Sequence, residues 1–103
     1  MNVYINELAS FLPNKPIDND SIEDVLGTLN GKPSKTKRRI LKNNKIENRY
    51  YAIDPVSGKL THNNAELTAE AVRNLISKAG IKTGQIDCLA CGTSSPDLLM
   101  PGH

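Results

Sequence analysis

The chain has 103 residues and a net charge of +2, from thirteen Lys and Arg against eleven Asp and Glu, and it contains no Trp. This length allows one small domain at most, with a core made mainly of Leu, Ile, Val and Ala. The mild charge is no sign of a nucleic-acid partner. No apolar run approaches the ~20 residues that span a bilayer, and no secretory signal is visible at the N-terminus. We therefore expect a cytoplasmic protein with neither a nucleic-acid nor a membrane partner.

The first thirty residues predict one strand and one short helix. Apolar and polar side chains alternate over residues 3–11, which indicates a strand that the following Leu-Pro pair ends. Asp20 and Glu23 have the spacing of a capping box, and apolar residues follow at helical spacing over residues 22–26. Gly27 is the expected end of this helix.

The segment 35–45, KTKRRILKNNK, carries six basic residues and no acidic one. We expect a helix here, with Ser34 or Thr36 as its N-cap and Ile40 and Leu41 as its apolar contacts. The preferred interpretation is a solvated helix face. The alternative is an electropositive rim for a phosphate-bearing or acidic partner. The segment has no interleaved aromatic residues, which argues against binding of single-stranded nucleic acid.

A strand is predicted over residues 46–53, followed by a turn at residues 54–58 and a short return strand, as in a hairpin or an extended loop. His62 stands alone at the junction that follows, with no second ligand type at metal spacing. A local hydrogen-bonding role is therefore preferred to a catalytic or metal-binding one.

The strongest predicted element is a helix from about Asn64 to Ala79. Asn63 and Glu66 have capping-box spacing, and Gly80 stands where a helix commonly ends. A continuous apolar stripe supports the assignment and consists of Leu67, Ala71, Val72, Leu75, Ile76 and Ala79.

The chain then predicts a buried strand over residues 86–91 and a loop of small residues over 92–96. A helix, a glycine turn and an apolar strand make half of a right-handed crossover unit. Cys88 and Cys91 form a C-x-x-C on this strand, where residues three apart point to opposite faces. We interpret them as small buried residues and expect neither a metal site, a disulfide nor a nucleophile.

Four stretches together resemble the N-terminal part of the β-ketoacyl-acyl carrier protein synthase III family, in the thiolase-like condensing superfamily. They are VYINELASFLPNKPIDN, KIENRYYA, LTAEAVRNLISKAGIKTGQID and CGTSSPDLLMPGH, and they follow the family order over nearly the whole chain. The segments KLTHNN and MPGH look closest to a subgroup that includes the dialkylresorcinol and aryl-polyene condensing enzymes.

The resemblance implies an α/β fold: residues 1–103 would be an incomplete N-terminal portion of a thiolase-like fold, with a mixed sheet and covering helices. It also implies a decarboxylating Claisen condensation of an acyl thioester with malonyl-acyl carrier protein. In the family, the nucleophilic cysteine and the His and Asn that assist it lie beyond the region matched here. We therefore expect no catalytic residue, metal or cofactor in this chain, and no activity from the chain alone.

The resemblance suggests two roles for residues of this chain. Met100 and Pro101 match a position that walls the acyl pocket of the dimer partner, although Met100 could instead cover the core of its own subunit. Arg49 matches an arginine interpreted as a structural anchor. The family clamps coenzyme A with a Trp and an Arg, but this chain has no Trp and has Asn43 where that Arg is expected.

The basic segment suits an acidic acyl carrier protein better than coenzyme A. The docking residues predicted for this partner are Lys35, Lys37, Arg38, Arg39 and Lys42. A chain with an open apolar sheet edge is also expected to pair, so we predict a homodimer or a larger oligomer. The rival hypothesis is a small non-enzymatic module that docks an acidic partner through residues 35–45.

Overall fold

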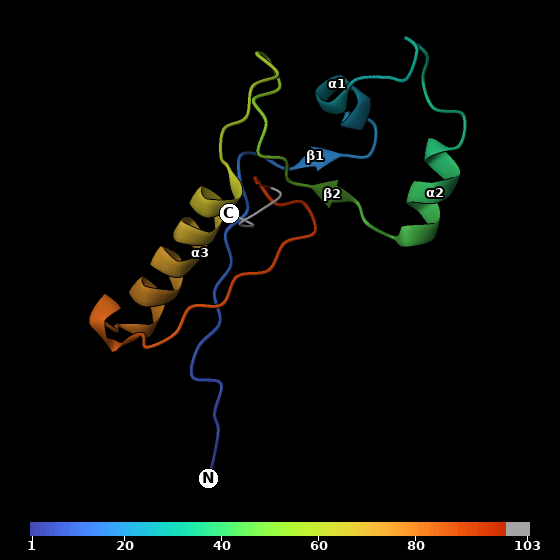
Figure 1. Cartoon of the computed structure of the whole chain (residues 1–103). Coiled ribbons are helices and arrows are strands. Elements are labelled where there is room, and N and C mark those ends of the chain that lie inside the picture. The colour runs from blue at the N-terminus through green and yellow to red at the C-terminus, as the bar shows by residue number, and fades with distance from the viewer. Residues whose placement is uncertain (99–103) are drawn as a thin grey trace. The chain divides into compact units, whose positions relative to one another are not determined.

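The computed structural model describes residues 1–98, which divide into two compact units. One unit is the continuous segment Pro13–Thr61, and the other combines Met1–Leu12 with the chain from His62 onward. The described residues contain three α-helices and one two-stranded antiparallel sheet (Figure 1). This content agrees with a partial α/β fold, while the predicted mixed sheet is not formed among the described residues.

The unit Pro13–Thr61 is organised by a short antiparallel strand pair and two helices. In the pair, Ile17 lies opposite Arg49 and Asp18 lies opposite Asn48. A single bridge between Ile53 and Leu60 marks the predicted hairpin. The elements of this unit are β1 (Ile17–Asp18), α1 (Ile22–Leu26), α2 (Lys37–Asn44) and β2 (Asn48–Arg49).

The start of α1 differs from the predicted capping box. Its N-cap is Ser21, which makes no side-chain cap hydrogen bond. The Asp18 carboxylate instead accepts hydrogen bonds from the backbone N–H groups of Asp20 (3.1 Å) and Ser21 (2.8 Å). The Glu23 carboxylate is bound elsewhere, so the predicted box between Asp20 and Glu23 is wrong. The predicted end of the helix at Gly27 is confirmed.

The predicted basic helix is confirmed as α2, which begins after Thr36 and ends at Lys45. The Thr36 side chain makes no cap hydrogen bond. Lys45 has φ of 56°, in the left-handed region, where a Cβ atom is unfavourable and glycine is preferred. The end of α2 is therefore strained at a single residue.

Replacing Lys45 with Gly should raise the free energy of unfolding by about 1 kcal/mol, because it removes this strain at the end of α2. The matched control is Lys42→Gly in the interior of α2, where glycine should cost about 1 kcal/mol. Thermal unfolding followed by circular dichroism measures both. If both variants changed the free energy of unfolding in the same direction, the assigned end of the helix at Lys45 would be wrong.

The long helix α3 (Asn64–Ala79) begins and ends where the sequence predicts. The Asn63 side chain accepts from the Glu66 backbone N–H, and the Asn63 backbone N–H donates to the Glu66 carboxylate, each at 2.8 Å. Gly80 ends the helix with φ of 66°. A short 3₁₀ helix, η1 (Thr83–Gln85), follows. The capping box and the terminal glycine are confirmed.

The capping box gives a second stability prediction. Asn63→Ala should lower the free energy of unfolding of the α3 unit by about 1 kcal/mol, because an N–H group in the first turn of the helix loses its acceptor. Asn74→Ala, within the same helix, is a control in which only the bond from Asn74 to the Ser10 carbonyl is lost. Helical circular dichroism against denaturant concentration measures the difference. A smaller loss for Asn63→Ala than for Asn74→Ala would contradict it.

The predicted strand over residues 3–11 is not formed. This segment lies along α3, where Asn74 Nδ2 donates to the Ser10 carbonyl (3.0 Å) and Lys78 Nζ donates to the Leu8 carbonyl (2.8 Å). Lys78 also forms an ion pair with Glu7 at 2.9 Å. Side chains of the helix thus bind the backbone of this segment, and no strand among the described residues pairs with it.

The predicted buried strand over residues 86–91 is not formed either, and both cysteines on it are exposed. A strand requires a neighbouring strand to accept and donate its backbone hydrogen bonds, and the described residues supply none here. The predicted strand over residues 46–53 is reduced to Asn48–Arg49, which pairs with the two residues of β1, and to a single bridge from Ile53 to Leu60. The burial predicted for Cys88 and Cys91 is therefore wrong for this structure.

Burial is shallow in both units. Pro13 is the only residue that is buried among those the structure describes, and no large apolar side chain reaches that state. The apolar stripe of α3 is half-buried, and large apolar side chains elsewhere stay exposed, such as Leu29 at 87% and Val56 at 94%. Each unit therefore has apolar surface without a covering layer.

Candidate docking surface on the basic helix

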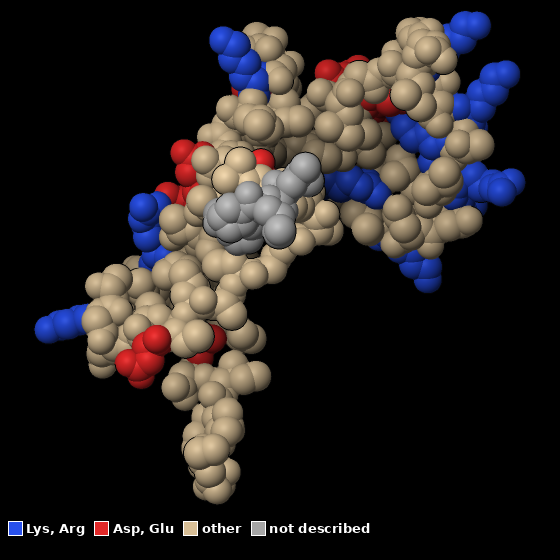
Figure 2. Space-filling view, in the orientation of Figure 1, with Lys and Arg blue, Asp and Glu red and all other residues tan. Residues whose placement is uncertain are grey.

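The positive charge of the chain is concentrated in the unit Pro13–Thr61. Ten of the thirteen basic residues lie there, against six of the eleven acidic residues. Figure 2 shows Lys and Arg side chains gathered around α2. Of the predicted docking residues, Lys35, Arg38, Arg39 and Lys42 are exposed, whereas Lys37 is only partly exposed. The structure thus places the predicted residues on and just before one helix.

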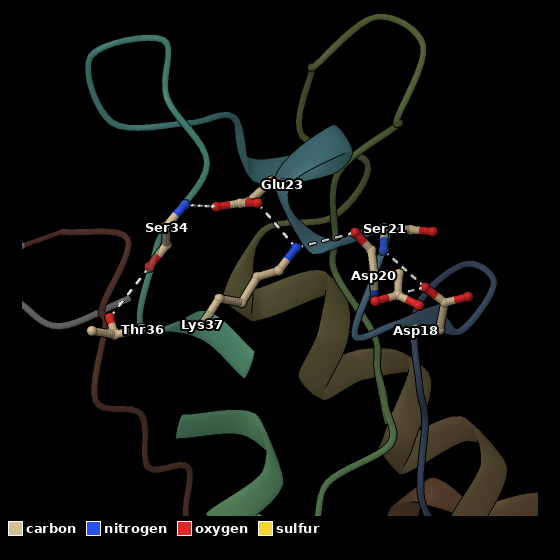
Figure 3. A network of polar contacts seen from close by, with 7 residues as sticks. All are labelled: Asp18, Asp20, Ser21, Glu23, Ser34, Thr36 and Lys37. Carbon is tan, nitrogen blue, oxygen red and sulfur yellow. Dashed lines mark hydrogen bonds and ion pairs between the residues drawn. The ribbon is translucent and has the colours of Figure 1, made fainter. Parts of the chain in front are cut away.

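Lys37 is held inside its own unit. Its ammonium group lies 3.0 Å from a carboxylate oxygen of Glu23 on α1 and 3.3 Å from the Asp20 carbonyl (Figure 3). The side chains of Lys37 and Glu23 are 24% and 18% exposed, so the pair is largely shielded from water. The second carboxylate oxygen of Glu23 accepts from the Ser34 backbone N–H at 2.7 Å. We call these contacts of Glu23, Ser34 and Lys37 the α1–α2 clasp.

The clasp shifts the ionisation of its acid. The Ser34 N–H and the Lys37 ammonium group hold the pKa of Glu23 below its ordinary value of 4.5, because both stabilise the ionised carboxylate. The pKa of Asp18 is lowered as well, chiefly by the hydrogen bond from the Ser21 backbone. Both carboxylates are therefore charged at neutral pH and stay bound to their partners.

A hollow of about 260 Å³ lies between α2 and the turn that follows β1. Arg38, Leu41 and Lys42 line it from α2, at the i, i+3 and i+4 positions that share one helix face. Leu41 is half-buried, so an apolar surface lies between two exposed cations. Asn19, Asp20 and Lys37 complete the lining of the hollow.

Asn19 is held by two polar contacts within the same unit. Its Oδ1 accepts from Arg49 Nη1 at 2.6 Å, and its Nδ2 donates to the Ile46 carbonyl at 3.0 Å. Arg49, on β2, thereby connects the strand pair to the wall of the hollow. These contacts support the interpretation of Arg49 as a structural anchor.

The other predicted site residues do not join this surface. Met100 and Pro101 lie outside the described residues, so their predicted pocket role stays a prediction. Cys88 and Cys91 are exposed and free, and no group of metal-binding side chains is present among residues 1–98. The His62 ring packs edge-on against Phe11, with ring centroids 5.5 Å apart. No helix in the described part of the chain has the length and apolar character to cross a bilayer.

The loop of small residues after residue 91 is tied to the start of α3. Asn64 donates from its backbone N–H and from Nδ2 to the Asp97 carboxylate, at 2.9 and 3.0 Å. Its Nδ2 also donates to the Ser95 carbonyl at 2.6 Å. An acidic side chain is favourable at the N-terminus of a helix, because the helix dipole is positive there. The contacts of Asp97 with Asn64 therefore hold this loop at the start of α3.

Sequence reasoning missed the clasp and the Asn64–Asp97 contact, because each joins residues far apart in the chain. The pairs Glu23–Lys37 and Asn64–Asp97 are separated by 14 and 33 positions. The one local signal was Glu23, an acid in the first turn of α1 that we assigned to a capping box. An ion pair between Glu23 and a basic residue of the following helix would have been an alternative prediction.

The chain is similar to curated proteins named β-ketoacyl-[acyl-carrier-protein] synthase III. Those from Porphyra purpurea and Campylobacter curvus are 33% and 32% identical over 97 and 95 residues, and the one from Chlorobaculum tepidum is 28% identical over 105 residues. These matches cover 94%, 91% and 98% of this chain but only 26%, 24% and 27% of the relatives.

The chain therefore spans about a quarter of the length of the curated relatives it matches. No family model matches it. The comparisons support the likeness to part of a synthase III, and the names of the relatives do not distinguish the dialkylresorcinol and aryl-polyene subgroup.

Proposed function

We propose that this chain is the N-terminal part of a β-ketoacyl-acyl carrier protein synthase III-like acyltransferase with a thiolase-like fold. The observation that carries the proposal is the likeness itself, which runs over nearly the whole chain and leads to relatives that share one name. The parent protein would join an acyl thioester to malonyl-acyl carrier protein in fatty-acid or related lipid synthesis. It would act as a cytoplasmic homodimer.

The chemistry assigned to the parent protein requires groups that we do not assign to this chain. A thiolate must take the acyl group as a thioester, and loss of carbon dioxide from the malonyl group then gives the enolate that attacks it. Thiolate chemistry of this kind favours a cysteine at a helix N-terminus or beside a cation. Cys88 and Cys91 lie on an exposed segment outside the helices. We therefore expect this chain alone to be inactive.

Intact mass spectrometry of the natural protein, incubated with an acyl donor, tests this function. We expect a chain several times longer than 103 residues that gains one acyl mass on a cysteine beyond His103. Peptide mapping after acylation would locate that cysteine. A natural chain that ends at His103 and gains no acyl mass would contradict the proposal.

We also propose that the exposed cations of residues 35–42 dock the acidic acyl carrier protein. Reversing the exposed Lys35, Arg38 and Arg39 to Glu in the natural protein should raise the KM for the carrier protein by roughly tenfold at low salt, because like charges then face the partner. The increase should shrink as salt is added. An unchanged KM would exclude this docking site.

A second candidate function follows from the same surface. The exposed cations on α2 would equally serve a small binding module that has no enzymatic role and docks an acidic partner through residues 35–45. Acylation of the natural protein separates the two candidates, because a binding module gains no acyl group. The pocket role of Met100 and Pro101, and membership of the dialkylresorcinol and aryl-polyene subgroup, belong to the first candidate only.

A further inference from the structure

A hollow of about 460 Å³ lies beside the hairpin in the unit Pro13–Thr61, and the functions proposed above do not use it. Its apolar lining consists of Ile17, Tyr51, Ile53 and Pro55, and its charged lining consists of Lys15 and Asp54. Small-molecule sites in proteins commonly have this size and this combination of an apolar lining with few polar groups. We call this cavity the hairpin hollow.

Hydrogen bonds hold the walls of the hairpin hollow in place. Asn14, which also lines it, donates from Nδ2 to the Tyr51 carbonyl at 2.8 Å and to Thr61 Oγ1 at 2.9 Å. Asn14 has φ of 60°, in the left-handed region that asparagine tolerates better than most residues. A backbone bond of 2.9 Å from the Thr61 N–H to the Ala52 carbonyl joins the two sides of the hairpin. A ligand would therefore meet a wall that is already formed.

The two charged side chains of the lining differ in what they bind. The Asp54 carboxylate accepts from the Ser57 hydroxyl and from the backbone N–H groups of Val56 and Ser57, the last two at 3.3 and 3.0 Å. The Ser57 hydroxyl and these N–H groups hold the pKa of Asp54 below its ordinary value of 3.8, so the carboxylate stays ionised at neutral pH. Lys15 is exposed and pairs with no acidic residue among residues 1–98. The cation is thus available to a ligand, whereas the anion is bound within the hairpin turn.

These charges select the class of ligand. A free cation beside an apolar surface favours a molecule that has an apolar body and one negative charge. A phosphate ester carries nearly two negative charges at neutral pH, and the ionised Asp54 repels the second one. A neutral apolar molecule gains nothing from Lys15. The lining therefore suits a monoanion best.

We propose that the hairpin hollow binds a small amphipathic carboxylate. The carboxylate of the ligand pairs with the Lys15 ammonium group, and its apolar body lies against Ile17 and Ile53. This site goes beyond the proposed acyl transfer and does not depend on it, because the ligand is bound as a free acid and no bond in it is made or broken.

The charge contact is tested in the natural protein with hydrocinnamate and its neutral analogue, hydrocinnamyl alcohol. Titrations followed by ligand-observed NMR give both Kd values. Lys15→Gln should raise the Kd of the acid by about fivefold and change that of the alcohol by less than about twofold, because only the acid loses an ion pair. Lys59→Gln is the matched control, since it removes the same charge from the hairpin outside the lining of the hollow. An unchanged Kd of the acid in Lys15→Gln, or equal losses in both variants, would overturn the proposal.

The apolar contact is tested with a second pair of variants. Ile53→Ala should weaken the binding of the acid and of the alcohol by about fivefold each, because both lose the same apolar surface. Val56→Ala is the control, since Val56 is 94% exposed and lies outside the lining. Equal effects of the two variants would show that the ligand does not lie in the hollow. Lys15 is exposed and unpaired among the described residues, so the charge test decides the proposal if Ile53→Ala does not fold.

Phenyl phosphate distinguishes a carboxylate site from a phosphate site. We expect it to bind no more tightly than hydrocinnamate, and binding that is tighter by more than about tenfold would overturn the assignment to a carboxylate. A natural protein that binds neither hydrocinnamate nor its alcohol at millimolar concentration would also overturn the proposal. These titrations contain no acyl donor and no carrier protein, so a failure of acylation and a failure of this site are separate results.

Discussion

Replacing Glu23 with Gln is expected to release α2 from α1. The carboxylate of Glu23 accepts from the Ser34 N–H and pairs with the Lys37 ammonium group, and an amide loses the charge that strengthens both contacts. The amide protons of α2 should then exchange with solvent faster, on the order of tenfold, because the helix opens without its contact to α1. Hydrogen exchange read by mass spectrometry or NMR measures this.

A matched control is available within the same unit. Glu47 is exposed, and Glu47→Gln makes the same chemical change without touching the clasp. We expect exchange in α2 to remain at the native rate in this variant. Similar acceleration in both variants would show that net charge, and not the clasp, determines the opening of α2.

The clasp also predicts how this unit responds to acid. The pKa of Glu23 is lower in the folded chain than its ordinary value of 4.5, so the folded state binds the proton less readily than the unfolded state. The stabilisation is therefore complete above pH 4.5 and is lost as the pH falls through the lowered folded value. In the native chain, amide exchange in α2 should accelerate over that acidic range, once the rates are corrected for the intrinsic pH dependence of amide exchange. In Glu23→Gln the acceleration over the same range should be much smaller.

The elements that could be predicted from the sequence are those that local contacts determine. The capping box of Asn63 and Glu66, the apolar stripe and Gly80 all lie within or directly beside α3, and its bounds are as expected. The helix α2 was predicted for a similar reason, since its length and its end depend on the residues from Thr36 to Lys45.

The elements that were predicted wrongly depend on partners far along the chain. Residues 3–11 and 86–91 have the alternation and the apolar character of strands, but the described residues provide no strand beside either one. Ala9 and Leu89 line one hollow of about 310 Å³ on α3, so the two segments come near each other without pairing. A pattern predicts that a segment can form a strand, whereas formation requires a neighbour.

The clasp was missed for a related reason. A charged residue such as Glu23 has many possible partners in a chain with many basic and acidic residues. Its actual partner, Lys37, is determined by how α1 and α2 pack. The candidate docking surface was therefore predicted as a set of cations, while the division of roles between Lys37 and Arg38 required the structure.

The second large effect we expect is self-association of the 103-residue chain. A groove of about 430 Å³ runs along α3 and is lined by apolar side chains such as Val72, Ile76 and Leu89. Leu89 is 61% exposed and stands on the extended segment 86–91, which lacks a strand partner among the described residues. Exposed apolar surface beside an open backbone edge favours pairing with a second copy.

We expect sedimentation velocity to give a dimer or a larger species that dissociates only on strong dilution. Leu89→Lys should shift the chain toward the monomer and lower its unfolding midpoint, because a charge at the groove opposes burial of the interface. Val56→Lys is the matched control, since Val56 is 94% exposed in the hairpin turn and lies outside the groove. A native chain that stays monomeric when dilute and still unfolds cooperatively would contradict the prediction, because its shallow core would then suffice without a partner.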